Sequence, residues 1–216
     1  MPALPLLTVA ILAGGAATRL DGRDKGLEPL QGRPLVAWVV DALWGTDASP
    51  SKAGFGLASG TVRGTSALLI VANRNLHEYA RYAATVTDAI PGFRGPLAGV
   101  AAALAACTTP LLLTAPVDCP DPPRDLAARF IEAMCPGGAD AIVAHDGERR
   151  QPLFALYRRE LAASAAAAAG AGQGVWAWQA SIGARELDFS ECRRQFHNLN
   201  TREEFAAYAA EHRLES

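Results

Sequence analysis

Lysine is nearly absent from this sequence, as are the cysteine patterns of several common protein classes. Among 20 basic residues only Lys25 and Lys52 are lysines, so almost every positive charge is an arginine. The cysteines form no C-x-x-C pair and no histidine lies at metal-ligand spacing from them, which argues against a zinc site and a disulfide framework. They are Cys107, Cys119, Cys135 and Cys192. We therefore expect reduced thiols, as in the cytoplasm.

Membrane-spanning and export segments are also missing from the pattern. Residues 1–18 have the length of a signal peptide but lack a basic start, and their apolar part ends in two glycines. Prolines divide the apolar run 95–117 into a helix-length piece and a strand-length piece. The run 161–184 is mostly Ala, Gly and Ser and too weakly apolar to insert. The sequence predicts a cytoplasmic protein with no membrane partner.

Excess positive charge is missing as well. The formal net charge is −2 and the pI is about 6.1, whereas a protein whose main partner is nucleic acid normally has a basic face. Half of the residues are hydrophobic, which excludes a mainly disordered chain. The 216 residues fit a single domain, 1–216, with a buried core.

The sequence does contain short apolar runs that alternate with helical stretches. Strands are predicted at 8–12, 67–71, 85–87, 111–113, 141–144 and 153–157. Helices are predicted at 34–44, 76–83, 96–106, 122–134, 158–169 and 201–212. The Gly/Ser-rich stretch 45–66 is expected to be a long surface loop. Strands separated by helices predict the α/β class: a three-layer, doubly wound, mainly parallel sheet with helices on both faces, as in Rossmann-like folds.

The strongest candidate for chemistry is the segment from Leu12 to Lys25. It directly follows the first apolar strand and reads Leu-Ala-Gly-Gly-Ala-Ala-Thr-Arg-Leu-Asp-Gly-Arg-Asp-Lys. Glycines there let backbone N–H groups converge on an anion, and Arg19 and Lys25 add positive charge. The segment is neither a Walker motif nor a dinucleotide fingerprint, and a tight turn with two solvated basic side chains is the alternative. A lysine retained in this lysine-poor chain favours phosphate binding, since a compact ammonium suits a tight pocket.

A second candidate is Asp118, just past the carboxyl end of the predicted strand 111–113. Open α/β sheets bind ligands at this place. A carboxylate there can hold Mg²⁺ against a nucleoside triphosphate. The alternative is an aspartate that turns a proline-rich loop. Cys119 is a poor Mg²⁺ ligand and is given no role.

Two weaker candidates follow. Gly95–Gly99 opens a helix with small residues, and Asp88, at the end of the preceding strand, could accept hydrogen bonds from N1–H and the 2-amino group of guanine. Ordinary helix–sheet packing is the alternative there. Asn198 and Asn200 project the same way if extended and suit a polar heterocycle, although a plain helix cap by Asn200 or Thr201 is the alternative. Thr201 and Glu204 have capping-box spacing.

Taken in order, these segments resemble the molybdenum cofactor guanylyltransferase family over nearly the whole chain. The segment Ile11–Lys25 and the Gly95–Gly99 motif occur in many sugar- and cofactor-nucleotidyltransferases, whereas the C-terminal motifs favour this family. The motifs that carry the resemblance are Ile11–Lys25 with Gly32–Leu35, Asp88, Gly95–Gly99, Pro116–Pro120, Gln151–Tyr157 and Phe196–Phe205.

The resemblance implies transfer of GMP from GTP to the terminal phosphate of Mo-molybdopterin, with release of pyrophosphate and with Mg²⁺ as cofactor. It implies a nucleotide-binding part at about 7–120 and an acceptor-binding part at about 121–216. Transient contact with cofactor-biosynthesis proteins or molybdoenzyme chaperones is expected. In this picture GTP is bound by Leu12, Ala13, Gly14, Gly15, Lys25, Asp88 and Asp118. The acceptor is bound by Asn198 and Asn200, and the catalytic residues are Lys25, Arg19 and Asp118, the last also being the metal ligand.

Three positions depart from the family pattern. Asp21 stands where the family usually has glycine, Val71 where well-matched members carry an asparagine near the base, and Gly174 where a basic residue often helps bind the pterin phosphate. Two alternatives therefore stay open. One is a cytidylyltransferase acting on the same cofactor, and the other is a non-catalytic carrier that keeps the nucleotide fold.

Overall fold

The computed structural model of the chain describes residues 7–13, 24–44, 67–88, 95–134 and 138–212. Several residues singled out in the sequence lie outside these ranges, as does the predicted loop 45–66. They are Gly14, Gly15, Arg19, Asp21, Lys52 and Cys135.

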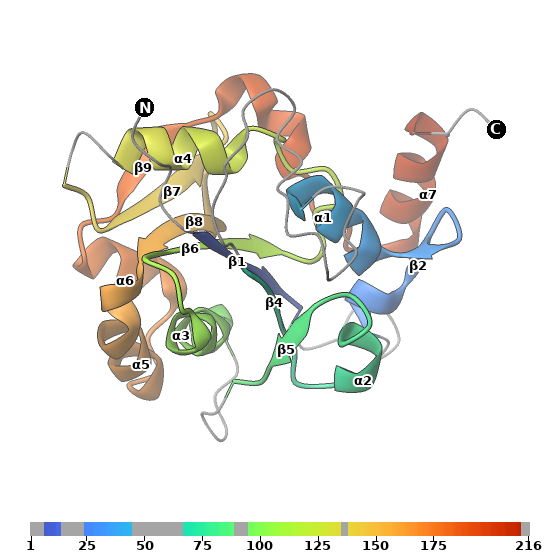
Figure 1. Ribbon diagram of the computed structural model, residues 1–216. Helices are drawn as coiled ribbons and strands as arrows, with labels where there is room; N and C mark the ends of the chain where they lie inside the picture. The colour runs from blue at the N-terminus through green and yellow to red at the C-terminus, as the bar shows by residue number, and fades with distance from the viewer. Residues whose placement is uncertain (1–6, 14–23, 45–66, 89–94, 135–137, 213–216) are drawn as a thin grey trace, which may run out of the picture.

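A seven-stranded sheet forms the centre of the molecule, in the order β5-β4-β1-β6-β8-β7-β9 (Figure 1). Strands β1, β4, β5 and β6 run parallel, and β9 is parallel to β7. Strand β8 is antiparallel to both neighbours, β6 and β7. Its pairing with β7 follows from the short turn between them, which is too short for a crossover. The mainly parallel sheet is therefore confirmed. The bounds are β1 Leu7–Leu12, β4 Ala67–Val71, β5 Ala84–Val86, β6 Leu111–Pro116, β7 Ala141–His145, β8 Arg150–Arg158 and β9 Arg185–Asp188.

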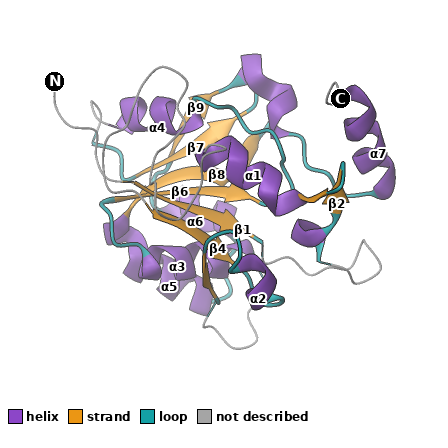
Figure 2. Cartoon of the chain, turned by 45° about the vertical axis from the view of Figure 1, so that its right-hand side comes forward, coloured by secondary structure: helices purple, strands orange, loops and turns teal. Residues whose placement is uncertain are grey.

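Helices cover both faces of this sheet, as predicted (Figures 1 and 2). One face carries α1 and α4, and the other carries α3, α5 and α6. Helix α7 lies beside the small β2-β3 hairpin in both views. The helices are α1 Leu35–Trp44, α2 Leu76–Tyr79, α3 Pro96–Ala106, α4 Leu126–Met134, α5 Ala162–Gly170, α6 Val175–Ser181 and α7 Arg202–Glu211. The shorter elements are β2 Pro29–Leu30, β3 Arg33–Pro34 and the 3₁₀ helices η1 Lys25–Leu27, η2 Arg159–Leu161 and η3 Ser190–Phe196.

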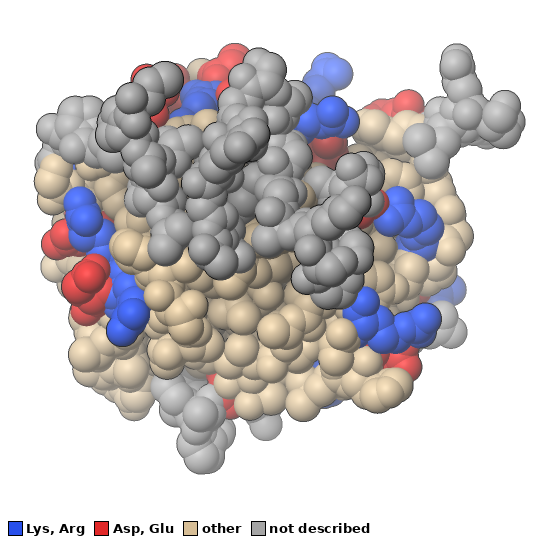
Figure 3. Space-filling view, viewed as in Figure 1, with Lys and Arg blue, Asp and Glu red and all other residues tan. Residues whose placement is uncertain are grey.

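The central strands supply a separate apolar cluster to each face of the sheet. In β1, Leu7, Val9 and Ile11 join the cluster beneath α1 and α4, whereas Ala10 joins the one beneath α3. This alternation is the period of two expected of a strand. Because both faces are buried, these strands read as continuous apolar runs in the sequence. Of the described residues on the face shown in Figure 3, basic and acidic side chains are interspersed around a wide uncharged area.

Several element ends differ from their predictions. Pro34 pairs with Pro29 in the β2-β3 hairpin, so α1 begins one residue later, at Leu35. Helix α2 ends at Tyr79, and α4 begins at Leu126 rather than at residue 122, where prolines follow each other. Arg158 ends β8 instead of starting a helix.

Helix α6 and strand β9 were not predicted. The residues before α6 have the low-complexity composition of a loop, and glycines bound the helix. Strand β9 is a short edge strand of mostly polar residues, so it lacks the apolar signal of the central strands. Within the described ranges, the longest apolar helices fall short of what crossing a membrane requires.

Candidate active site

The carboxyl ends of four parallel strands bring polar residues to one edge of the sheet. Leu12 at the end of β1 is level with Val71 of β4 and with Pro116 of β6. Val71 is in turn level with Val86 of β5. Strands lie about 4.8 Å apart, so the ends of β5 and β6 are separated by about 14 Å. This edge lies where the chain crosses from one side of β1 to the other, which is the place where open α/β sheets bind ligands.

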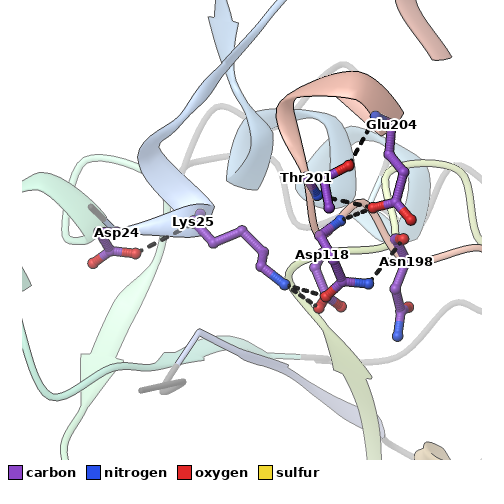
Figure 4. A network of polar contacts seen from close by, with 8 residues as sticks. Asp24, Lys25, Asp118, Asn198, Thr201 and Glu204 are labelled. Atoms are coloured by element: carbon purple, nitrogen blue, oxygen red, sulfur yellow. Dashed lines mark hydrogen bonds and ion pairs between the residues drawn. The ribbon is translucent and has the colours of Figure 1, made fainter. Parts of the chain in front are cut away.

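Lys25 lies at the β6 end of this edge, between two acceptors. Its Nζ donates to Asp118 Oδ2 at 2.9 Å and to Asn200 Oδ1 at 2.7 Å (Figure 4). The Lys25 and Asp118 side chains are 26% and 19% exposed, so the ion pair is partly shielded from water. The fold thus joins η1, the loop after β6 and the segment before α7. Three predicted site residues from distant parts of the chain meet here.

The position of Lys25 is fixed by Asp24, the residue that caps η1. Asp24 Oδ1 accepts from the backbone N–H of Gly26 at 3.2 Å and from the hydroxyl of Tyr79 at 2.5 Å. Asp24 Oδ2 accepts from the side-chain amide of Asn75 at 3.0 Å. Burial, aided by Asp24, raises the pKa of Tyr79 well above its usual value, so the phenol stays a donor.

Gly26 allows this arrangement because a side chain would not fit. A Cβ at this position would lie 2.3 Å from Tyr79 Oη and 2.9 Å from Val117 Cγ2. Both distances are shorter than van der Waals contact, so a larger residue would push η1, and Lys25 with it, away from the edge. The sequence showed Gly26 only as part of a polar stretch.

The two carboxylate oxygens of Asp118 differ in their contacts. Oδ2 accepts from Lys25, whereas Oδ1 is buried and has no hydrogen-bond partner among the described residues. The backbone carbonyl of Asp118 accepts from the N–H of Leu199 at 2.8 Å, which holds the 198–200 segment against this loop. Burial raises the pKa of the neighbouring Cys119 thiol, which donates to the Gln195 carbonyl at 3.0 Å and stays neutral.

Asn198 and Asn200 differ in their contacts. The Asn200 side chain is engaged at both ends, because Oδ1 accepts from Lys25 and Nδ2 donates to the carbonyl of Asn198 at 3.2 Å. Asn198 Oδ1 is buried and has no partner within the described part of the chain. Thr201, not Asn200, is the N-cap of α7, and it forms the predicted capping box with Glu204.

Asp88 lies at the other end of the edge, after β5, and is paired with Asn73. The Asn73 amide donates to Asp88 Oδ2 at 2.8 Å, and the backbone N–H of Asp88 donates to Asn73 Oδ1 at 3.1 Å. Val71 is buried within β4 on the side of α3. The asparagine that reaches Asp88 is thus two residues further on, a contact that the sequence comparison at Val71 did not reveal.

The remaining candidates have structural roles in packing, helix capping and sheet pairing. A Cβ at Gly99 would lie 3.6 Å from Leu12 and 3.7 Å from Val71, which is ordinary van der Waals contact. Gly95 and Gly174 are the N-cap residues of α3 and α6. The backbone N–H of Ala13 donates to the Val71 carbonyl at 2.8 Å. The Ala13 N–H is therefore engaged within the sheet.

Known proteins resemble this chain over most of its length. A family model described as a MobA-like NTP transferase domain matches residues 9–186. The molybdenum cofactor guanylyltransferase of Vibrio cholerae is 38% identical over 203 residues, covering 94% of this chain and 91% of the relative. The enzyme of the same name from Burkholderia vietnamiensis is 38% identical over 222 residues, covering 97% of this chain and 99% of the relative.

Solved structures share the fold. Molybdopterin-guanine dinucleotide biosynthesis protein A from Archaeoglobus fulgidus has a TM-score of 0.69 at 21% identity, covering 93% of this chain and 95% of its own. The 2-C-methyl-D-erythritol 4-phosphate cytidylyltransferase from Thermus thermophilus has a TM-score of 0.62 at 17% identity, covering 95% and 98%. At these identities the likeness is one of architecture, the Rossmann-like arrangement predicted from the sequence.

Proposed function

The chain belongs to the MobA-like NTP transferase family, and we propose that it transfers GMP from GTP to the terminal phosphate of Mo-molybdopterin. The products are molybdopterin guanine dinucleotide and pyrophosphate. The observation that carries this proposal is the cluster of Lys25, Asp118 and Asn200 at the carboxyl edge of the sheet. The names of the curated relatives, 38% identical over nearly the whole chain, support the choice of substrates.

The chemistry needs positioning and charge neutralisation more than acid–base catalysis. The acceptor is already a phosphate anion, so its oxygen attacks the α-phosphorus of GTP directly, and the bond to the pyrophosphate oxygen breaks in line. Lys25 carries the positive charge that offsets the negative charge of the phosphates. Asn200 accepts a hydrogen bond from the Lys25 ammonium and keeps it in place. Leu12 and Ala13 line the nucleotide in this proposal, together with Gly14, Gly15 and Arg19, which lie outside the described residues.

Asp118 fits the role of a magnesium ligand. Its Oδ1 is buried without a partner among the described residues, and a hard carboxylate oxygen is what Mg²⁺ prefers. Within those residues no group of three or more His, Cys, Asp or Glu side chains gathers. A single carboxylate is sufficient, because Mg²⁺ is commonly held by one or two carboxylates together with substrate phosphates and water. When bound, Mg²⁺ would neutralise charge on the phosphates.

Asp88 is proposed to read the base. A carboxylate only accepts hydrogen bonds, and guanine offers two neighbouring donors, N1–H and the 2-amino group, whereas cytosine offers its 4-amino group alone. Asn73 holds one oxygen of Asp88 and leaves acceptor capacity for the base. This chemistry favours GTP over CTP, despite the valine at position 71.

The acceptor is proposed to lie on the side of Asn198 and Asn200. This would make residues 7–120 the nucleotide-binding part and 121–216 the acceptor-binding part of one domain. The buried open oxygen of Asn198 supports this placement, since it faces no protein donor in the described part of the chain. A cytoplasmic location belongs to the same proposal and is supported by the free thiols of the three cysteines in the described part of the chain. Transient contacts with cofactor-biosynthesis proteins or molybdoenzyme chaperones would deliver substrate and product.

The test is turnover of Mo-molybdopterin with an equimolar mixture of GTP and CTP and with Mg²⁺. Mass spectrometry of the product identifies the transferred nucleotide, and pyrophosphate release gives the rate. We expect the guanine dinucleotide and one pyrophosphate for each product. A cytosine dinucleotide would contradict the base assignment, and the absence of pyrophosphate with active substrate would favour a carrier.

A further inference from the structure

The start of α7 is connected to the candidate active site by one carboxylate. Glu204 Oε2 accepts from the backbone N–H of Thr201 at 2.9 Å, and Thr201 Oγ1 accepts from the N–H of Glu204 at 3.1 Å. These two bonds complete a capping box. The same Oε2 also accepts from the backbone N–H of Asn200 at 2.5 Å, a bond that the capping box does not require. Glu204 therefore fixes Asn200, the residue before the cap, as well.

That extra bond acts on the residue that contacts Lys25. The Asn200 amide is oriented by its own Nδ2, which donates to the Asn198 carbonyl and so turns Oδ1 toward the Lys25 ammonium. On the other side, Leu199 is fully buried and its N–H donates to the Asp118 carbonyl. The short segment is thus held between Asp118 and Glu204.

Helix α7 has other attachments, so Glu204 is not needed merely to keep it in place. The Gln31 amide donates to the carbonyls of Ala209 at 3.3 Å and His212 at 2.7 Å, at the far end of the helix. Phe205 and Tyr208 pack against the cluster of Leu30, Leu35 and Leu199. Loss of the Glu204 carboxylate should leave the helix attached while freeing Asn200.

We propose that Glu204 is a positioning residue for the transfer reaction: it fixes Asn200, which in turn holds the Lys25 ammonium beside Asp118. The expected effect of Glu204 on turnover rests on the proposed function. The backbone N–H of Asn200 lowers the pKa of Glu204, so the side chain is a carboxylate, and an acceptor only, at neutral pH. Glutamine in its place would still offer one acceptor oxygen.

The kinetic test compares four single variants of the full chain. Glu204→Ala removes the acceptor and should lower kcat by about 10- to 100-fold, as expected for a misplaced charged group, with KM for GTP changed by less than about threefold. Glu204→Gln should restore most of kcat. Thr201→Ala breaks the other half of the capping box but leaves both N–H groups that Glu204 accepts from. It should therefore lower Tm, though by less than Glu204→Ala, while kcat stays near that of the wild type. Glu203→Ala, which changes an exposed acid in the same helical turn, should alter neither.

A second readout does not depend on turnover, because the chain has only two lysines. Mass spectrometry can follow the acylation of Lys25 by a small amine-reactive acylating reagent, with Lys52 as the reference in the same molecule. An ammonium held by acceptors is protected, so Glu204→Ala should raise the Lys25 rate roughly tenfold relative to Lys52, the effect of losing one charge-assisted hydrogen bond. Glu204→Gln and Thr201→Ala should leave the ratio near that of the wild type.

The outcomes separate the two proposals. Equal losses of kcat and Tm in Thr201→Ala and Glu204→Ala, with an unchanged lysine ratio, would show that Glu204 only caps the helix. A wild-type protein without turnover would refute the proposed function, whereas the lysine ratio would still decide the positioning role. If Glu204→Ala does not fold, Glu204→Asp serves instead, since it keeps the charge but withdraws the carboxylate from Asn200.

Discussion

Two polar clusters occupy opposite ends of the same sheet edge, and they are built differently. In the first, Lys25 contacts Asp118 and Asn200, which lie 93 and 175 residues away in the sequence. In the second, Asn73 and Asp88 are 15 residues apart and joined by a hydrogen bond that is exposed to solvent. A group that must stay fixed during bond breaking gains from several anchoring segments, whereas a group that reads a base needs only to face it. We therefore expect changes in the first cluster to reduce turnover and changes in the second to alter nucleotide choice.

The largest effect is expected from Asp118→Ala. The change removes the proposed metal ligand and leaves the Lys25 ammonium without its ionic partner. Pyrophosphate release should fall by at least about 1,000-fold, the scale of losing a main electrostatic contribution to the transition state. Asp121→Ala in the same loop is the control and should keep most of the activity. Full activity of Asp118→Ala would show that this cluster takes no part in the reaction.

Substitution of Lys25 should have the next largest effect. Lys25→Ala removes the charge and should lower kcat by about 100-fold or more. Lys25→Arg keeps the charge, but a planar guanidinium does not match two acceptors placed 2.9 and 2.7 Å from a single nitrogen, so a loss of roughly tenfold is expected. Lys52→Arg is the matched control and should be silent. Equal activity of Lys25→Arg and the wild type would show that charge alone is sufficient.

The second cluster should change selectivity more than rate. Asp88→Ala removes the acceptor for the base and should reduce the ratio of kcat/KM for GTP over CTP by about 10- to 100-fold. Asn73→Ala leaves the carboxylate but loosens it, so a smaller reduction, about three- to tenfold, is expected. Competition between the two nucleotides, read by product mass, measures both. An equal loss of turnover with GTP and with CTP would contradict the proposal that the two clusters have different roles.

The sequence predicted the strand ends better than the contacts between them. Asp88 and Asp118 could be placed at one edge because parallel strands end together and apolar runs mark buried strands. The bond from Lys25 to Asn200 spans most of the chain and depends on how α7 packs, which no local pattern encodes. The contact of Tyr79 with Asp24 was missed for the same reason. The capping box was found because it is local, but its extra bond to Asn200 was not.

The smallest effects concern the support beneath the first cluster, where stability and position can be separated. Gly26→Ala should destabilise the protein by about 1–3 kcal/mol, because the new methyl group would overlap Tyr79 Oη and Val117. Tyr79→Phe removes one hydrogen bond to Asp24, which Asn75 and Gly26 still contact, and should cost about 1 kcal/mol. Chemical denaturation measures both changes.

Combining the two substitutions tests whether they share one cause. The closest overlap of the Gly26→Ala methyl group is with the hydroxyl that Tyr79→Phe deletes, at 2.3 Å, while the contact with Val117 at 2.9 Å remains. The double variant should therefore be more stable than the sum of the single changes predicts, by about 0.5–1 kcal/mol. Strict additivity would mean that Val117 alone limits position 26. In that case the β6 loop at Val117, and not the Tyr79 hydroxyl, would set how closely η1 approaches the sheet.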